Sequence, residues 1–331
     1  MSVLITGAAG FVGLSVAEAV LADGREAVLF DTQPLPESAR MAFARLPGAY
    51  HEIVGDTRDA AALDAAFEAH GVARVVHGAA VTGAYERERS DAATILAVNV
   101  MGTLAVLEAA RRHGVQRFLY PGSVTVYGES LYMYDAMDEG TTPPVPVGTY
   151  GITKYAAERL SLRYRDLWGM DVVAARIGVV FGPWERDTSY RDTLSLYSQT
   201  ARLAVRGEEA VLPAERFRRD WVYSRDLAAA LVALLDAEAL RYTVYNIASG
   251  TVSDDAPAWC TRLQARFPRF SWRVAGKADE ANILNHEERH RRPQSVARLH
   301  DGLGFRPAFD FDAACDDFLA WIAATPGYWT E

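Results

Sequence analysis

The sequence predicts an α/β protein built on a Rossmann-type, doubly wound parallel sheet with a smaller C-terminal lobe. Through the first half of the chain, short runs rich in Val and Ala alternate with longer amphipathic stretches. A glycine-rich turn at 7–13 follows the first run, and past about residue 177 the alternation breaks. Runs that are apolar throughout are typical of strands buried on both faces of a parallel sheet, and right-handed crossovers then give the doubly wound arrangement.

The individual elements follow from the period of the apolar residues. We expect strands at 2–6, 26–31, 50–54, 73–77, 116–121, 171–176 and 243–247. Helices are expected at 92–113, 150–168, 193–206, 254–266 and 311–323. Residues 129–149 hold three prolines and two glycines, which predicts a long loop and makes this segment a candidate lid.

Composition excludes several classes of protein. Half of the 331 residues are apolar, 23% are charged and the formal net charge is −9, which argues against nucleic-acid and anionic membrane partners. The two cysteines, Cys260 and Cys315, lack metal-ligand spacing, so we expect a reduced, cytoplasmic protein without a metal centre. No signal peptide fits the strand-like start, and no apolar run approaches the length of about 18 residues that spans a membrane.

The turn after the first strand predicts a dinucleotide site. Gly7, Gly10 and Gly13, with Phe11 and Val12 between them, open the following helix. Glycines permit a tight turn and a close approach of pyrophosphate, and the helix N-terminus offers N–H donors and partial positive charge. Taken alone, the pattern could equally be a plain turn.

Two carboxylates extend the cofactor hypothesis. Asp31 ends the second strand 18 residues after Gly13, where a carboxylate can bind the adenosine ribose. Thr32 and Gln33 bring no positive charge for a 2′-phosphate, so NAD is favoured over NADP. Asp56 could accept a hydrogen bond from adenine. The alternatives are a turn residue for Asp31 and a helix N-cap for Asp56.

The candidate reactive residues are Tyr150, Lys154 and Ser123. A spacing of four places Tyr150 and Lys154 on one helical face, where a positive charge would lower the pKa of the phenol and allow it to exchange a proton with an alcohol. Ser123 follows the fifth strand at its carboxyl end and could polarise the substrate oxygen, with Thr125 a weaker substitute. A plain helix face and a turn-capping hydroxyl are the alternatives.

Ten sequence blocks in order resemble the extended short-chain dehydrogenase/reductase family, also known as the NAD-dependent epimerase/dehydratase family. They are GAAGFVG (7–13), Asp31, GD (55–56), HGAA (77–80), NVMGT (99–103), SVTVYG (123–128), YGITK (150–154), RIGVVFGP (176–183), RDWVYSRDLA (219–228) and YNIASG (245–250). The blocks cover roughly residues 1–250, and LGFRP (303–307) is a weaker match.

The resemblance implies a set of contacts. The predicted cofactor contacts are Gly7, Gly10, Phe11, Val12, Gly13, Asp31, Asp56, Thr57, Gly78, Ala79, Ala80, Asn99, Tyr150, Lys154 and Gly178. The predicted substrate contacts are Thr82, Ser123, Arg186, Arg191 and Arg219. For the arginines, a solvated surface is the alternative, whereas a ligand carboxylate or phosphate would be held by bidentate bonds. His77 and Trp184 are interpreted as packing residues.

Three departures from the family pattern narrow the chemistry. Val124 and Thr125 stand where the sugar dehydratases carry Asp-Glu, which disfavours dehydration because neither residue transfers protons at neutral pH. Val179 replaces an asparagine that binds nucleotide sugars, and residues 211–216 replace a glycine-rich segment. Arg219 remains where the family often contacts a diphosphate, and Arg291 or Arg292 lies in the region of a second phosphate-binding arginine.

We therefore expect an NAD-binding domain at 1–177 plus 219–247 and a substrate-binding lobe at 178–218 plus 248–331. The favoured function is NAD-dependent dehydrogenation of a secondary alcohol on a carbohydrate-like small molecule. A sugar or nucleotide-sugar epimerase that retains its NAD is the alternative, and a non-catalytic NAD-binding scaffold disagrees with the intact reactive residues. A homodimer is expected through the helices at 92–113 and 150–168, unless their small and apolar residues only face the sheet. These residues are Ala93, Ala97, Ala156, Ala157 and Leu160.

Overall fold

The structure is a computed structural model of the full chain. It describes residues 2–83, 85–188, 190–191, 194–276, 280–284 and 289–329.

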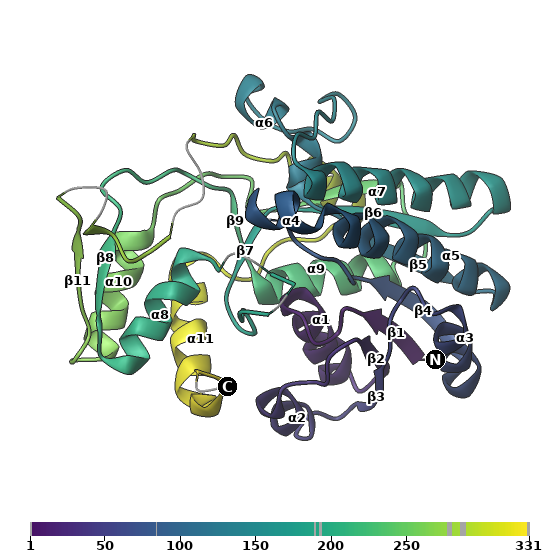
Figure 1. Ribbon diagram of the computed structural model, residues 1–331, viewed down its shortest axis with the longest axis horizontal. Coiled ribbons are helices and arrows are strands. Elements are labelled where there is room, and N and C mark those ends of the chain that lie inside the picture. Colours follow the sequence, from purple (N-terminus) through teal and green to yellow (C-terminus); the bar gives the residue numbers. More distant parts are fainter. Residues whose placement is uncertain are drawn as a thin grey trace.

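A seven-stranded, entirely parallel sheet forms the centre of the molecule, in the order β10-β6-β5-β4-β1-β2-β3 (Figure 1). The strands are β1 (Ser2–Thr6), β2 (Glu26–Asp31), β3 (Ala49–Val54), β4 (Val72–His77), β5 (Arg117–Pro121), β6 (Val172–Ile177) and β10 (Val244–Ile247). The first six strands have the Rossmann order, reversing between β1 and β4, and β10 adds a seventh beside β6. The predicted fold class is confirmed, and every expected strand is present within one residue at each end.

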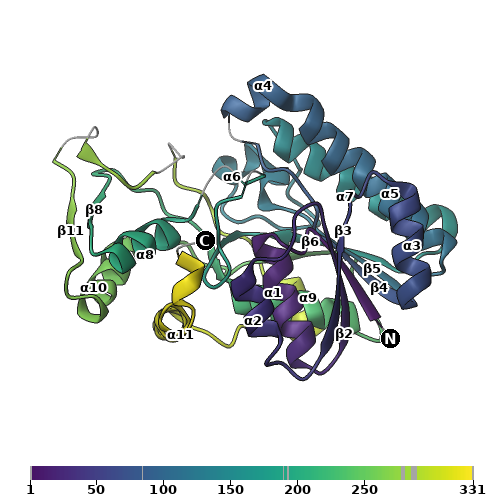
Figure 2. The same ribbon diagram turned by 60° about the horizontal axis from the view of Figure 1, so that its bottom comes forward.

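Helices cover both faces of the sheet because successive strand residues point to opposite sides. Val3 and Ile5 of β1 pack with α1 (Phe11–Ala22) and α9 (Ser224–Asp236) on one face. Leu4 packs on the other face with α3 (Ala60–His70), α5 (Thr103–Arg112) and α7 (Thr149–Trp168). Figure 2 shows α3, α5 and α7 side by side over this second face.

The helix expected at 92–113 is longer and composite. It consists of α4 (Tyr85–Leu96), a π-helical turn η1 (Ala97–Gly102) and α5. Within Tyr85–Arg112, an 18-residue window has a mean hydropathy of 1.7, so by length and composition alone this run could cross a membrane. Part of the window is buried against the fold. A helix that packs on a sheet passes the same test, so the finding does not identify a membrane span.

The C-terminal elements gather to one side of the sheet (Figure 1). They are α8 (Leu196–Arg206), β8 (Glu209–Leu212), α10 (Ala256–Arg266), β11 (Ser271–Val274) and α11 (Phe311–Ala324). Strand β7 (Val179–Phe181) pairs in parallel with β9 (Trp221–Tyr223). This two-stranded sheet lies where the chain passes between the predicted NAD-binding domain and the predicted substrate-binding lobe. The proposed division into domains stays a prediction. The remaining short elements are α2 (Glu37–Phe43), η2 (Val124–Tyr127), α6 (Ser130–Met133), η4 (Arg298–Gly302) and η5 (Pro326–Trp329).

Aromatic side chains join the C-terminal elements to the sheet. Trp184, Trp259 and Phe318 are fully buried, and Trp259 stacks on Phe318 with ring centroids 5.3 Å apart. The Trp184 ring contacts those of Phe43 and Trp321, and its Nε1 donates a hydrogen bond to Glu18 at 3.0 Å. Trp184 is therefore a packing residue, as the sequence indicated.

The loop at 129–149 is not the expected lid. It is bonded to residues 289–298, and we call this connection the brace. The backbone of Met137 bonds to Pro293 and Ser295, and Glu129 forms an ion pair with Arg289. Buried Glu139 accepts a hydrogen bond from the Asn246 backbone at 2.6 Å. Because these bonds hold the loop against residues 289–298 and β10, it links the middle of the chain to its C-terminal part.

Candidate active site

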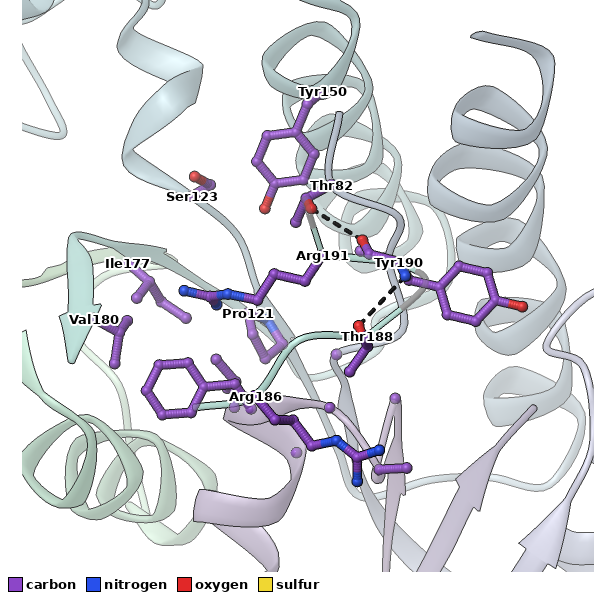
Figure 3. A pocket seen from close by; sticks show the side chains of 18 of the residues that line it. Thr82, Pro121, Ser123, Tyr150, Ile177, Val180, Arg186, Thr188, Tyr190 and Arg191 are labelled. Atoms are coloured by element: carbon purple, nitrogen blue, oxygen red, sulfur yellow. Dashed lines mark hydrogen bonds between the residues drawn. The ribbon is translucent and has the colours of Figure 1, made fainter. Parts of the chain in front are cut away.

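A cavity of about 1130 Å³ opens at the carboxyl ends of β1, β4, β5 and β6. This is the edge at which the strand order reverses, and doubly wound sheets bind their ligands there. Its walls come from the turn after β1, the segments after β4, β5 and β6, the start of α7, and residues 186–188, 190 and 191 (Figure 3). No described residue of 129–149 lines it.

The turn after β1 is shaped by glycine. Gly7 has φ +70°, and a Cβ there would lie 2.7 Å from the Ala79 nitrogen. A Cβ on Gly13 would lie 2.1 Å from the Gly7 carbonyl oxygen, so only glycine lets α1 pack this closely on the turn. Gly10 caps α1 without a side-chain hydrogen bond, and the first turn carries no acidic residue. The N–H groups at this helix end therefore suit a pyrophosphate.

Asp31, the last residue of β2, lines the cavity. Its carboxylate accepts hydrogen bonds from the Ala9 nitrogen at 2.9 Å and the Gln33 nitrogen at 3.0 Å. Burial raises the pKa of Asp31, and these hydrogen bonds act in the opposite direction. Gln33 and Pro34, which also line the wall, carry no positive charge. The site therefore fits NAD, whose ribose diol can donate to this carboxylate.

Ser123 and Tyr150 face the cavity together. In Figure 3 the phenol of Tyr150 and the hydroxyl of Ser123 point into the same space. Ser123 caps η2, accepting from the Thr125 nitrogen at 3.2 Å and the Thr125 hydroxyl at 2.9 Å. Thr125 therefore orients Ser123 rather than replacing it. Burial raises the pKa of Tyr150, while a hydrogen bond with Ser123 and the positive charge of Arg191 lower it.

Lys154 lies one turn further along α7 and is buried. Its Nζ donates to the Pro121 carbonyl oxygen at 2.7 Å and lies 4.5 Å from the ring centre of Tyr120. Burial lowers the pKa of Lys154 to about 7. The sequence had suggested that this lysine lowers the pKa of the phenol. In the structure the groups that lower the Tyr150 pKa are Ser123 and Arg191 instead.

Arg191 is held in the cavity by a buried carboxylate that the sequence analysis missed. Its Nη2 donates to Glu185 Oε1 at 2.6 Å, and its guanidinium lies 5.0 Å from the ring centre of Phe11. The Glu185 carboxylate also accepts from the Ser195 nitrogen at 2.7 Å and from the Ser195 hydroxyl. No sequence pattern marks Glu185 as a site residue, because its role depends on Arg191 and Ser195, which lie six and ten residues away.

The other predicted substrate contacts occupy different places. Thr82 lines the cavity, and its hydroxyl donates to the Tyr190 carbonyl oxygen at 2.9 Å. Arg186 also lines the cavity, but Figure 3 shows its guanidinium turned away from Tyr150. Arg219 does not line this cavity. It lines an adjoining one of about 230 Å³, together with Phe217 and Trp221.

The two cavities share part of their walls. Val179, Val180, Arg191 and Arg291 line both of them. Arg291, which the sequence placed only in the region of a phosphate-binding residue, therefore stands at their junction. The two cavities are therefore neighbours, one at the reactive residues and one among the C-terminal elements.

Four predicted cofactor contacts lie outside the cavity wall. Asp56 forms a bidentate ion pair with Arg58, with a shortest distance of 2.6 Å, and the cap of α3 is Asp59 instead. Asn99 accepts from the Val81 nitrogen at 2.8 Å and donates to Val81 and Thr153 at 3.0 Å. Thr57 and Ala79 pack against neighbouring turns. For these four residues a cofactor contact stays a prediction. The remaining predicted cofactor contacts that line the wall are Gly78, Ala80 and Gly178.

Fold and site together are those of a dinucleotide-binding enzyme, with a cavity at the carboxyl edge of a parallel sheet that Tyr150 and Ser123 line. The family follows from comparison with known proteins. The profile of the NAD dependent epimerase/dehydratase family matches residues 3–248, so the chain belongs to this family. The resemblance, the enzymatic nature and the NAD cofactor predicted from the sequence are thereby confirmed.

Characterised relatives are moderately similar over most of their length. The dTDP-L-rhamnose 4-epimerase of Burkholderia thailandensis is 27% identical over 365 residues, covering 97% of this chain and 94% of that protein. UDP-glucuronate 4-epimerase 1 of Arabidopsis thaliana is 24% identical over 352 residues, covering 100% of this chain and 79% of that protein. The structure of MoeE5 in complex with UDP-glucuronic acid and NAD has the same fold, with a TM-score of 0.76, 24% identity and coverage of 98% and 99% of the two chains.

Proposed function

We propose that this enzyme epimerises a secondary alcohol on a nucleotide-linked sugar that carries a carboxylate. The observation that supports this most directly is Arg191, which lies beside Tyr150 and is held there by buried Glu185. A guanidinium at the reactive end of a sugar site suits a substrate carboxylate, because the two groups can form paired, charge-assisted hydrogen bonds.

The adjoining cavity supports a nucleotide at the other end of the substrate. Phe217 and Trp221 offer aromatic surfaces, and Arg219 and Arg291 offer positive charge. Relatives named for UDP-linked and dTDP-linked sugars agree with this assignment. Val179 stands where the family's nucleotide-sugar enzymes carry an asparagine, so we expect binding there to depend on packing rather than on a side-chain amide.

The reaction follows from the residues around the reacting carbon. Tyr150 takes the proton of the sugar hydroxyl, and Ser123 donates a hydrogen bond to the same oxygen. The β1 turn and Asp31 would hold NAD, which would accept the hydride from the sugar carbon and return it to the opposite face of that carbon. Lys154 fixes the carbonyl of Pro121 next to Ser123. Val124 and Thr125 offer no acid or base for loss of water, so epimerisation is favoured over dehydration.

The dehydrogenase reaction that the sequence favoured uses the same residues and differs only in the fate of the hydride. The enzyme should be incubated with UDP-glucuronate and, separately, with UDP-glucose, without added NAD. Nuclear magnetic resonance would detect an epimeric uronate, and absorbance would detect free NADH. We expect an epimer from both sugars, with a clearly higher kcat/KM for UDP-glucuronate than for UDP-glucose, and no stoichiometric NADH. Accumulation of NADH that requires added NAD would identify a dehydrogenase, and faster turnover of UDP-glucose would contradict the carboxylate assignment.

A further inference from the structure

Two histidines and a glutamate come together on the surface at the amino end of β2. They are Glu26, His51 and His70, and within the described part of the chain their ligand atoms lie within 4.8 Å of one another. Glu26 Oε1 is 3.0 Å from His51 Nε2. The rings of His51 and His70 stack with centroids 4.2 Å apart. None of these side chains lines either cavity.

The register of β2 and β3 places Glu26 and His51 on the same face of the sheet. In the parallel register of β2 and β3, Val28 is opposite His51, and Phe30 is opposite Ile53. Val28, Phe30 and Ile53 pack under α3. Because side chains alternate along a strand, Glu26 and His51 belong to this same α3-covered face. Arg25, which points to the opposite face, pairs with Asp236 of α9.

The helix brings the third side chain to the same place. Leu63, Ala66 and Phe67 are the buried residues of α3, and His70 continues their face one turn later as the last residue of the helix. Gly71 then turns the chain with φ 54°. The cluster therefore lies at the open end of the seam between α3 and the sheet. The carbonyl end of a helix carries partial negative charge, which favours a cation.

We infer that Glu26, His51 and His70 form a binding site for a divalent transition-metal ion of the zinc class. Two imidazoles and one carboxylate are ligands that zinc prefers, at distances of about 2.0–2.2 Å, with water completing a tetrahedron. All three backbones are held by regular structure. Binding therefore needs only rotation of partly exposed side chains, and His51 and Glu26 retain 46% and 43% of their side-chain surface.

Such an ion would fasten the edge strand β3 to β2 and α3. Strand β3 is the last strand of the sheet, so it has only one partner strand. Asp31, at the carboxyl end of β2, is five residues from Glu26, a separation of about 16 Å along the strand. We therefore expect zinc at this site to raise thermal stability while leaving the affinity for NAD unchanged.

The test is an equilibrium zinc titration of tag-free protein against a competing chromophoric chelator, combined with thermal melts. The variants are His51→Ala, His70→Ala and Glu26→Gln, and the control is His113→Ala. His113 is a suitable control because it also pairs with a carboxylate, Asp64 at 2.9 Å, but belongs to no three-ligand group among the residues that the structure describes. We expect one zinc ion per chain and a rise in melting temperature for the wild type and the control.

Each of the three variants should bind zinc at least about tenfold more weakly and lose the rise in melting temperature. Circular dichroism and NAD titration would verify that the variants remain folded, and His51→Gln provides a milder substitution at the most exposed position. Zinc affinity that is unchanged in the doubly substituted His51→Ala/His70→Ala protein would overturn the assignment. So would the absence of zinc binding by the wild type at micromolar concentrations.

Discussion

Tyr150 is expected to carry proton transfer, and removing its oxygen should isolate that role. In Tyr150→Phe we expect kcat to fall by roughly 10² to 10⁴, because only the proton-transferring group is lost. NAD affinity should stay within about twofold of wild type, as measured by fluorescence titration. Burial raises the pKa of Tyr150, so the rate of the wild type should increase with pH as the phenol ionises. Near-normal turnover of the variant would place the reactive centre elsewhere.

Glu185 positions Arg191, so its effect should be selective for the substrate carboxylate. Glu185→Gln keeps the shape of the side chain and removes the charge that holds the guanidinium. We expect KM for the carboxylated sugar to rise about tenfold with kcat nearly unchanged, as for loss of one charge-assisted contact. The neutral sugar serves as the control substrate, and its kinetics should not change. Equal losses for both substrates would mean that Glu185 acts only on stability through Ser195 and α8.

At the scale of single residues, the sequence predicts those site residues whose type is constrained by the local backbone. Gly7, Gly13 and Asp31 were predictable because a tight turn and a strand end constrain residue type wherever they occur. The roles of Glu185 and of Arg291, which lines both cavities, were not predictable, because each depends on tertiary contacts rather than on sequence spacing. Asp56, which its position after the third strand suggested as an adenine contact, forms an ion pair with Arg58, and the adenine contact stays a prediction.

At the scale of elements, α1 should be intolerant of a methyl group at Gly13. A Cβ there would meet backbone atoms, which cannot move aside as a side chain does. We expect Gly13→Ala to lower the free energy of unfolding by about 1–3 kcal/mol and to weaken NAD binding at least tenfold. Gly24→Ala is the matched control, since no atom lies within 4 Å of its added methyl and only the cost of φ +72° remains. Equal NAD affinity in the two variants would contradict the close-packing argument.

The elements that were predicted well are those whose buried apolar residues form a regular pattern along the chain. All seven strands of the main sheet have an unmistakable apolar pattern, and their ends agree with the structure within one residue. The loop at 129–149 was misjudged because composition indicates irregular backbone but not its partners. Its bonds to Pro293, Ser295 and Arg289 join segments about 160 residues apart, and no local sequence pattern predicts such contacts.

At the scale of the whole molecule, α4, η1 and α7 leave an apolar surface that predicts a dimer. Leu96, Met101 and Ile152 are 53%, 52% and 49% exposed. Ala93 is also exposed and Ala97 is half-buried, whereas Ala157 is buried and Leu160 packs partly against the core, so those two belong to the monomer. Contiguous apolar surface of this kind is typical of subunit interfaces.

We expect light scattering at micromolar concentration to give twice the mass of the chain. Met101→Glu combined with Ile152→Glu should give the monomer mass, because burying two carboxylates in an apolar interface is unfavourable. Met133→Glu, which alters a more exposed methionine on α6 (74%), is the control and should leave the dimer intact. A wild-type protein of monomeric mass would remove the dimer from consideration.

The brace between 129–149 and 289–298 bears on how the protein is made on the ribosome. The strands and turns that hold NAD lie within the first 250 residues, so they can assemble while the chain is still being translated. Arg291, which lines both cavities, and residues 293–295, which bond to the loop at 129–149, are synthesised after those strands and turns. The cofactor site can therefore form on a nascent chain before the segment that completes the adjoining cavity has been synthesised.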